Sequence, residues 1–158
     1  MAPAGDLWTI LAAAGALVWL GILLAPWQPW RIRERFAAGD VAPEHTNLSH
    51  VTVLIPARDE ARYIGATLTA LGEQGSGLHV ILVDDRSEDG TAEIACRATP
   101  DSCDLEIVDG APLPSGWAGK MWALEQGLQQ VKTPLVLLLD ADIELAPAAL
   151  PALIAAKQ

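Results

Sequence analysis

Residues 78–85 read LHVILVDD, a nearly continuous apolar run that ends in two aspartates. A run of this kind, like the one at residues 135–139, is typical of a parallel strand covered on both faces. Shorter β-branched runs occupy residues 51–55 and 105–108. Helical patterns alternate with these runs at residues 61–71, 91–98, 120–130 and 147–156. The alternation is that of βαβ units, so the sequence predicts an α/β fold with a parallel sheet.

Acidic residues follow each of the four predicted strands. They are Asp59, Glu60, Asp84, Asp85, Asp109, Asp140 and Asp142. The carboxyl ends of parallel strands form the edge at which ligands bind. We therefore expect at least five carboxylates to converge there, and their mutual repulsion indicates a divalent cation. Capping of helix N-termini is an alternative reason for Glu60, Ser87, Glu88 and Asp89. It explains Asp140 less well, because Asp140 directly ends an apolar strand.

Composition and charge exclude several classes of protein. The chain has 158 residues, a net charge of −10 and a mean hydropathy of +0.28. Residues 51–158 carry 7 basic and 16 acidic side chains, which disfavours nucleic acid as a partner. An apolar fraction of 51% disfavours disorder. Cys96 and Cys103 are too few for a disulfide scaffold or a four-ligand zinc site, and they favour a reduced cytosolic setting.

The first thirty residues are predicted to be a transmembrane anchor. No charged residue lies between Asp6 and Arg31, and the apolar stretch at residues 7–25 would be about 28 Å long as a helix. Tryptophans lie near both ends, at Trp8, Trp27 and Trp30. A signal peptide carries its basic residues before the apolar run, whereas here they follow it, so an uncleaved anchor is favoured.

Residues 31–49 are predicted to be a basic juxtamembrane segment and linker. Arg31, Arg33 and Arg35 follow the apolar run, and the positive-inside rule then places residues 50–158 in the cytoplasm. The predicted location is therefore the cytoplasmic, or inner, membrane.

Four motifs follow in order. They are VTVLIPARDEARYIGATLTAL at 51–71, VILVDDRSEDGT at 80–91, LPSGWAGKMWALEQGL at 113–128 and VLLLDADIEL at 136–145. Together they resemble the nucleotide-binding half of a family 2 glycosyltransferase, which has the Rossmann-like GT-A fold. With the preceding anchor, the third motif is most similar to glycosyltransferases associated with hopanoid biosynthesis. The resemblance covers residues 50–158.

The resemblance assigns residues to a nucleotide site. Pro56, Ala57 and Arg58 form the turn that holds the base and ribose, with Glu60 beside it. Asp85 matches the acceptor for the uracil ring N–H, a role that suits an ionised carboxylate.

Three further positions have alternative roles. Asp84 belongs to the same nucleotide site or holds the turn. Lys120 contacts the phosphate or donor sugar, or is a solvated lysine at a helix start. Trp117 borders the sugar or a lipid acceptor, or packs the Gly-rich loop, whereas Trp122 is expected in the core.

The D-x-D signature implies a metal site. By resemblance, Asp140 lies near the ribose and metal, and Asp142 coordinates the metal. Carboxylate oxygens favour Mg²⁺ or Mn²⁺. Such an ion bridges the diphosphate of a nucleotide sugar and stabilises the charge that develops on it.

The implied reaction is transfer of a sugar from a nucleotide-sugar donor, with a UDP-sugar favoured, to a lipid or triterpenoid acceptor at the membrane. The family's catalytic base lies beyond the D-x-D signature and is expected downstream of Gln158, so we expect this chain alone to be inactive. Two alternatives stay open. One is a membrane-anchored nucleotide- and metal-binding module without transfer activity, and the other is a receiver-like Mg²⁺-binding domain.

Overall fold

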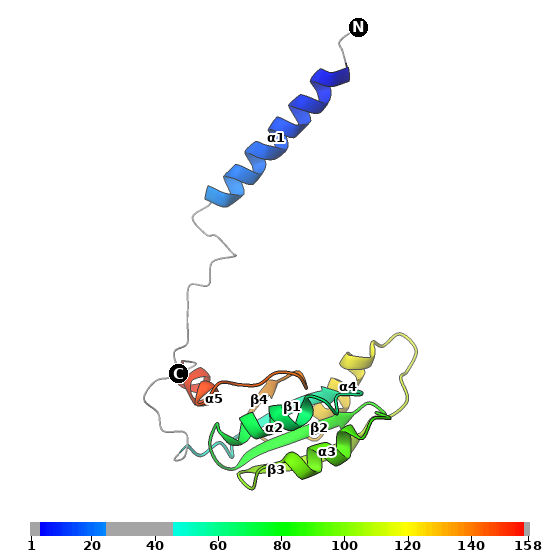
Figure 1. Cartoon of the computed structure of the whole chain (residues 1–158), viewed down its shortest axis with the longest axis vertical. Coiled ribbons are helices and arrows are strands. Elements are labelled where there is room, and N and C mark those ends of the chain that lie inside the picture. Colours follow the sequence, from blue (N-terminus) through cyan, green and yellow to red (C-terminus); the bar gives the residue numbers. More distant parts are fainter. Residues whose placement is uncertain (1–3, 25–45, 157–158) are drawn as a thin grey trace. The chain divides into compact units, whose positions relative to one another are not determined.

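The chain divides into two compact units, Met1–Arg35 and Phe36–Gln158. A computed structural model describes residues 4–24 and 46–156. Helix α1 (Ala4–Leu24) belongs to the first unit, and every other described helix and strand belongs to the second (Figure 1). Trp27, Trp30, the three arginines at 31, 33 and 35, and most of the predicted linker at 31–49 lie outside the described residues.

Helix α1 has the length and composition of a membrane span. Leu7–Leu24 is the single stretch of the described residues that is long and apolar enough to cross a bilayer, and none of it is buried. Large apolar side chains are exposed along the whole helix, from Leu7 to Leu24. A helix that is apolar on all sides lacks the polar face of a surface helix of a soluble domain.

The second unit contains a four-stranded parallel sheet. Its strands are β1 (Val51–Ala57), β2 (Leu78–Asp84), β3 (Cys103–Asp109) and β4 (Leu135–Leu138), in the order β3-β2-β1-β4. The α/β fold predicted from the sequence is confirmed, with strand ends within two residues of the predicted ones. This order equals the first part of the doubly wound order 3-2-1-4-5-6. A receiver-like domain would place β1 beside β3, so that alternative is wrong.

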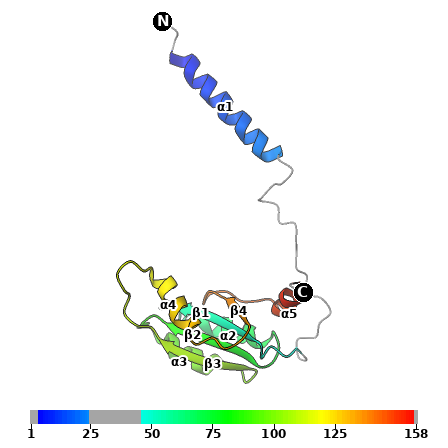
Figure 2. The ribbon, with the colours of Figure 1, turned by 180° about the vertical axis from the view of Figure 1, so that it is seen from behind.

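Helices cover the two faces of the sheet. They are α2 (Ile64–Gly72), α3 (Thr91–Ala98), α4 (Gly119–Leu128) and α5 (Ala149–Ala156). Because side chains alternate along a strand, Val53 and Ile55 pack in one core with α2, α3 and α5, and Leu54 packs in a second core with α4. Figure 2 shows the same arrangement from behind.

Glycine at position 127 allows α4 to approach the sheet closely. A Cβ atom there would clash with the side chains of Leu54 and Val83. The second core is therefore tight where α4 crosses β1 and β2.

Strand β4 differs from its predicted environment. Strand β2 is almost entirely buried, as predicted, but the side chains of β4 alternate between half-buried and exposed. Val136 and Leu138 are on the same face of the sheet as α4, but α4 does not extend over β4. Their side chains are therefore 39% and 55% exposed. The prediction that β4 is covered on both faces is wrong for the part of the chain that the structure describes, because α4 extends over β1 and β2 only.

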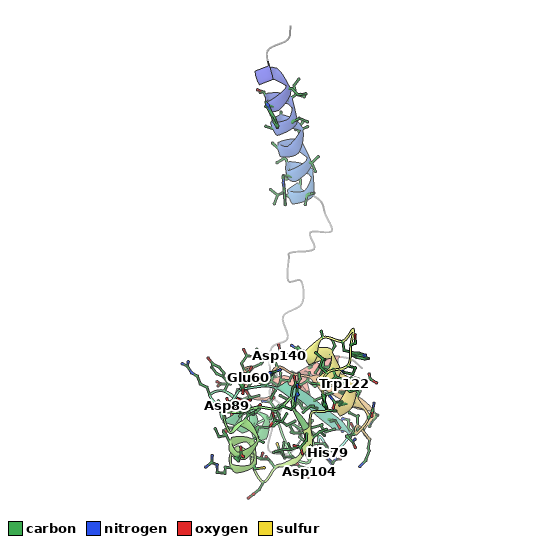
Figure 3. All side chains as sticks on the ribbon, turned by 90° about the vertical axis from the view of Figure 1, so that its right-hand side faces the viewer. Glu60, His79, Asp89, Asp104, Trp122 and Asp140 are labelled. Atoms are coloured by element: carbon green, nitrogen blue, oxygen red, sulfur yellow. The ribbon has the colours of Figure 1, made fainter. Side chains whose placement is uncertain are left out.

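The two ends of the sheet carry different polar groups. Figure 3 shows Glu60 and Asp140 at one end, and His79 and Asp104 at the other. His79 Nδ1 lies 3.2 Å from Asp104 Oδ2, across the paired amino ends of β2 and β3. The carboxyl ends of the strands, where Glu60 and Asp140 lie, form the edge at which ligands bind in this class of fold.

Candidate functional site

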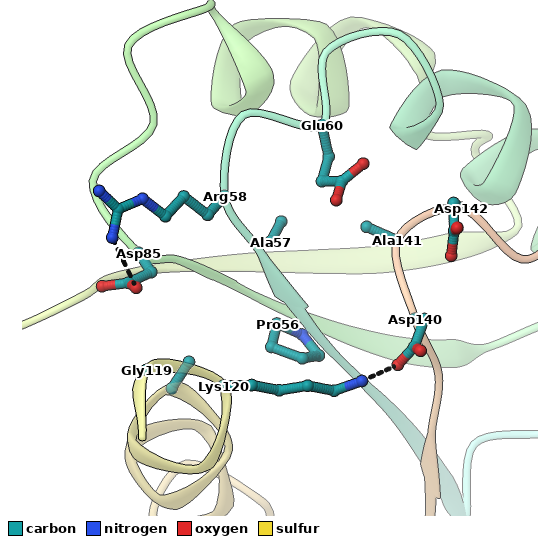
Figure 4. A pocket seen from close by; sticks show the side chains of 11 residues that line it. Pro56, Ala57, Arg58, Glu60, Asp85, Gly119, Lys120, Asp140, Ala141 and Asp142 are labelled. Atoms are coloured by element: carbon teal, nitrogen blue, oxygen red, sulfur yellow. Dashed lines mark hydrogen bonds and ion pairs between the residues drawn. The ribbon is translucent and has the colours of Figure 1, made fainter. Parts of the chain in front are cut away.

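A cavity of about 390 Å³ lies at the carboxyl ends of β1, β2 and β4 (Figure 4). Its lining residues come from the turns after these strands and from the first turns of α4. They are Pro56, Ala57, Arg58, Glu60, Asp85, Gly119, Lys120, Ala123, Asp140, Ala141 and Asp142. Every residue that the sequence assigned to the nucleotide or the metal is in this set except Asp84.

The cavity opens where the sheet divides between β1 and β4. The carbonyl of Leu54 accepts a hydrogen bond from Leu139 on the β4 side, and the carbonyl of Ala57 accepts one from Asp85 on the β2 side. Since backbone groups alternate along a strand, position 56 faces β4. Pro56 has no N–H to donate there, and the ladder between β1 and β4 ends at Leu138. The proline thus marks the point at which β4 leaves β1 and the cavity begins.

Side chains of the turn after β2 hold the turn after β1. Ser87 Oγ accepts a hydrogen bond from Asp59 N at 3.0 Å, and Asp59 Oδ1 accepts one from Glu88 N at 2.9 Å. Asp59 has a positive φ of 55°, a conformation that aspartate tolerates better than most residues. The two turns are therefore joined in both directions beside Arg58.

Two further bonds complete this junction. Thr91 Oγ1 accepts from Glu60 N at 2.9 Å, and Asp89 Oδ2 accepts from Ala61 N at 2.9 Å. The Thr91 hydroxyl donates to Asp89 Oδ1, and this bond, together with the backbone N–H groups of Ala61 and Thr91, lowers the pKa of Asp89 below its ordinary value of 3.8. The Asp89 carboxylate therefore accepts backbone hydrogen bonds from both turns, from Ala61 N and Thr91 N. The main chain of Glu60 is held by the bond from its N–H to Thr91.

Asp84 has a structural role. Its Oδ1 accepts a hydrogen bond from Ser87 N at 2.9 Å, and its carbonyl accepts one from Gly110 N at 2.8 Å. Asp84 is absent from the cavity lining. Its assignment to the nucleotide site stays a prediction, and the alternative prediction, that it holds the turn, agrees with these bonds.

Asp85 is the most buried carboxylate of the cavity. The residue is 9% exposed, and its Oδ2 lies 3.6 Å from a guanidinium nitrogen of Arg58. A Cβ atom on Gly119 would lie 3.4 Å from the same oxygen, so the start of α4 is closely opposed to this carboxylate. Asp85 is left as a hydrogen-bond acceptor at one end of the cavity, next to Pro56, Ala57 and Arg58 (Figure 4).

The D-x-D segment is fixed from behind by α2. Thr67 Oγ1 donates to the carbonyl of the buried Ala141 at 2.7 Å, and the carbonyl of Asp140 accepts from Ile143 N at 3.2 Å. With Ala141 turned into the core, Asp140 and Asp142 line the cavity, and both residues are exposed. Lys120 Nζ donates to Asp140 Oδ1 at 2.6 Å, so a cation from α4 already meets this carboxylate.

The acidic residues that follow the strands lie at the carboxyl edge of the sheet, as expected, but in the described part of the chain they do not form one cluster around a metal ion. Of the seven acidic residues that follow the strands, four line the cavity, namely Glu60, Asp85, Asp140 and Asp142. Within residues 4–24 and 46–156, no three His, Cys, Asp or Glu side chains come close enough to hold a metal ion. Asp59 and Asp84 are instead engaged by backbone N–H groups, which explains their presence without a cation.

Asp140 and Asp142 nevertheless fit a shared metal ion. Mg²⁺ is commonly held by one or two carboxylates together with substrate phosphates. Two exposed carboxylates on one wall of an open cavity match that donor set. The geometry thus fits an ion held jointly with a diphosphate rather than one held by the chain alone.

The loop before α4 is packed by Trp122. Its Nε1 donates to the carbonyl of Ala111 at 3.1 Å, and its ring meets the ring of Trp117 edge-on with centroids 5.3 Å apart. Trp117 is outside the cavity lining and 43% exposed, which favours its packing role over a contact with the donor sugar. Trp122 is half-buried under the loop instead of in the core, because its N–H takes the loop carbonyl as partner.

A family model described as "Glycosyl transferase family 2" matches residues 52–158. The chain belongs to glycosyl transferase family 2. The family-level resemblance drawn from the four motifs is thereby confirmed. The narrower similarity to transferases of hopanoid biosynthesis stays a prediction.

Two relatives of the family act on lipid-related substrates, according to their names. A 4,4'-diaponeurosporenoate glycosyltransferase of Staphylococcus haemolyticus is 29% identical over 106 residues, which is 67% of this chain and 28% of that protein. An undecaprenyl-phosphate 4-deoxy-4-formamido-L-arabinose transferase of Shewanella sediminis is 31% identical over 115 residues, or 69% and 33% of the two chains. This family 2 chain thus spans about a quarter to a third of the length of the curated relatives it matches.

Solved structures of glycosyltransferases share the fold. A mannosyltransferase from Pyrobaculum calidifontis, in complex with GDP-Man and Mn²⁺, has a TM-score of 0.66 and 29% identity over 91% of this chain and 41% of its own. Glucosyl-3-phosphoglycerate synthase from Mycobacterium tuberculosis, in complex with Mg²⁺ and UDP, has a TM-score of 0.51 and 22% identity over 64% and 36% of the two chains. The second likeness shows the fold alone.

Sequence reasoning missed residues that position this family 2 site without touching the cavity. Thr67 and Thr91 are fully buried hydroxyls that bond across the site, and Gln74 is a fully buried amide. Gln74 donates to Ala146 O at 3.1 Å and accepts from Leu150 N at 3.0 Å, which ties α2 to the segment after the D-x-D turn. A polar residue at a buried position of a predicted helix is the signal that could have drawn attention to Thr67 and Gln74.

Proposed function

We propose that the cavity binds the donor of a sugar-transfer reaction, a nucleotide sugar. The observation that supports this most is that one cavity has the groups for both parts of such a donor. Asp85 is a buried acceptor for an N–H of the base, and the other end offers a cation and a carboxylate pair that could hold a metal ion beside the diphosphate. Lys120, Asp140 and Asp142 supply the latter groups. A UDP-sugar is the narrower proposal, because an ionised carboxylate accepts from the uracil ring N–H.

The proposal assigns different roles to the two ends of the cavity. Pro56, Ala57 and Arg58 line the base and ribose end beside Asp85, where the Arg58 guanidinium also shields the carboxylate charge. Lys120 lies in the first turn of α4, and its ammonium meets the negative charge of the diphosphate. The free N–H groups at the start of α4 favour the same charge.

Asp140 and Asp142 are the residues that would hold Mg²⁺ or Mn²⁺. When bound, the ion would neutralise charge on the leaving diphosphate as a Lewis acid. The Thr67 hydroxyl would support this pair, because it donates to the carbonyl of Ala141, which lies between the two aspartates.

The proposed acceptor is a membrane lipid, for which the two named relatives and helix α1 are the support. A triterpenoid of the hopanoid type is the narrower proposal. Residues 1–30 would anchor the protein in the inner membrane. Residues 31–49 would link this anchor to residues 50–158, which would carry the donor site on the cytoplasmic side. The arginines at 31, 33 and 35 support this orientation.

Calorimetry of the full chain in detergent tests the donor site. UDP-sugar is titrated with and without Mn²⁺, and binding is expected to be metal-dependent. Asp142→Ala is expected to weaken binding in Mn²⁺ on the order of 100-fold, because one of two protein ligands is lost.

Glu144→Ala is the matched control. Glu144 is an exposed carboxylate two residues further on that does not line the cavity, so its removal should leave the affinity unchanged. Equal affinity with and without metal, or equal losses in the two variants, would contradict the proposed D-x-D role.

A further inference from the structure

The loop between β3 and α4 is free of charge and exposes large apolar side chains. Residues 110–118 read GAPLPSGWA, and no charged residue lies between Asp109 and Lys120. Leu113 is 47% exposed, Trp117 is 43% exposed, and Met121 in the first turn of α4 is 56% exposed. Figures 1 and 2 both show this loop, drawn in yellow, extending beyond the body of the sheet.

The loop is held in its exposed position by specific bonds. Ala111 N donates to Gln126 Oε1 at 2.7 Å, and Ala111 O accepts from Trp122 Nε1 at 3.1 Å. Trp117 packs edge-on against Trp122, and its N–H donates to Pro114 O at 3.3 Å. An amide and an indole of α4 thus hold the base of the loop, so that Leu113 stays in solvent instead of collapsing onto the helix.

This loop contrasts with the charge of the rest of the chain. A net charge of −10 repels the anionic surface of a cytoplasmic leaflet. An uncharged loop that exposes Trp and Leu side chains, with Met121 beside it, can enter the headgroup region at little electrostatic cost.

We propose that the loop at residues 110–118, with Met121, inserts into the headgroup region of a lipid bilayer. The candidate span in α1 belongs to the same chain, and the residues between Leu24 and Val51 can bridge at most about 90 Å, which keeps the loop within reach of a membrane. The inference goes beyond the proposed donor site, since a nucleotide sugar can bind whether or not the loop meets lipid.

Membrane contact at this loop would serve a lipid acceptor. Gly119 and Lys120 follow the loop directly and line the cavity. A loop seated in the headgroups would therefore place the phosphate end of the donor beside the surface from which a lipid acceptor emerges. The acidic surface would at the same time disfavour contact elsewhere on the unit.

The test places a fluorophore on the loop of the full chain in phosphatidylcholine vesicles. In a background with Cys96→Ser and Cys103→Ala, Leu113→Cys is labelled with an environment-sensitive dye and challenged with lipids that carry an acyl-chain doxyl quencher. Leu128→Cys is the matched control, because Leu128 is 45% exposed and ends the same helix that the loop precedes.

The label at position 113 is expected to shift to shorter wavelength and to lose roughly half or more of its emission to the lipid quencher. The label at position 128 is expected to stay in water. Added salt and added anionic lipid should not increase quenching at position 113, because apolar contact and not charge drives it.

Equal quenching at the two positions, or none at position 113, would overturn the inference. A blue shift at position 113 without lipid quenching would also overturn it, since another part of the protein or a second copy would then cover the loop. Should Leu113→Cys impair folding, Ser115→Cys places the label in the same loop at an exposed polar position. Nucleotide binding is measured separately on each variant, so a failure of lipid contact and a failure of the donor site give different results.

Discussion

The turns after β1 and β2 and the segment after β4 border the same cavity, yet they use their carboxylates differently. In the two turns, Asp59, Asp84 and Asp89 accept hydrogen bonds from backbone N–H groups. After β4, Asp140 and Asp142 are exposed, and their carboxylates accept no hydrogen bond from a backbone N–H of the described residues. Acidic residues that look alike in the sequence thus divide into those that hold the turns together and those that face the cavity.

After Asp142→Ala, the next largest effect on ligand binding is expected at Asp85, which lines the cavity beside the turn-holding Asp84. Asp85→Asn should weaken binding of a UDP-sugar roughly 10- to 100-fold, because the variant exchanges a charged acceptor for a neutral one and leaves Arg58 without its partner. Metal dependence should persist, since Asp140 and Asp142 are intact. Calorimetry with and without Mn²⁺ measures both quantities.

Asp84→Asn is the neighbouring control. It keeps the side-chain oxygen that accepts from Ser87 N and lies outside the cavity lining, so the affinity should stay near that of the unaltered chain. If the substitution at 84 weakens binding as much as the one at 85, the division between the two aspartates is wrong.

A smaller effect is expected from removing the Thr67 hydroxyl, which holds the segment that carries Asp140 and Asp142. Thr67→Val removes the donor to Ala141 O and leaves that carbonyl buried without a partner, which should lower the free energy of unfolding by about 1–2 kcal/mol. Thr69→Val is matched to it on the same helix, because the Thr69 hydroxyl donates to Gly65 O at the exposed surface and its loss costs little. Urea unfolding of both variants distinguishes them, and similar stabilities would contradict the assigned role of Thr67.

The smallest effect is expected from the pH dependence of Asp89. Its folded pKa is lowered, so its ionised form contributes stability above the unfolded pKa, near 3.8, and that contribution is lost as pH falls through the folded value. The difference in unfolding midpoint between the unaltered chain and Asp89→Asn should be constant from pH 7 to pH 5 and should shrink below pH 3.8. A difference that grows on acidification would mean that other groups determine the stability of these turns.

Much of the fold could be predicted because it depends on local patterns. Apolar runs set all four strands to within two residues of their observed ends, and the D-x-D signature led to a cavity wall. The bonds that join the two turns could not be predicted, because Asp59 and Glu88 are 29 residues apart and their pairing depends on the sheet being formed. The same holds for Thr67 and Ala141, which are 74 residues apart.

The exposure of β4 was missed for a related reason. Its sequence is as apolar as that of β2, but burial depends on what lies above each face, and α4 covers β1 and β2. The role of Trp122 was missed likewise, since its indole N–H found a partner in the loop carbonyl of Ala111.

The proline at position 56 makes the width of the cavity a property of the main chain. Because Pro56 offers no N–H toward β4, the two strands separate there whatever side chains line the gap. Substitution of an exposed lining residue such as Arg58 would then change the side chains that line the opening, while β1 and β4 stay apart. For the proposed nucleotide-sugar donor, the preference for one sugar would then depend on the lining side chains, while the strand framework stays as it is.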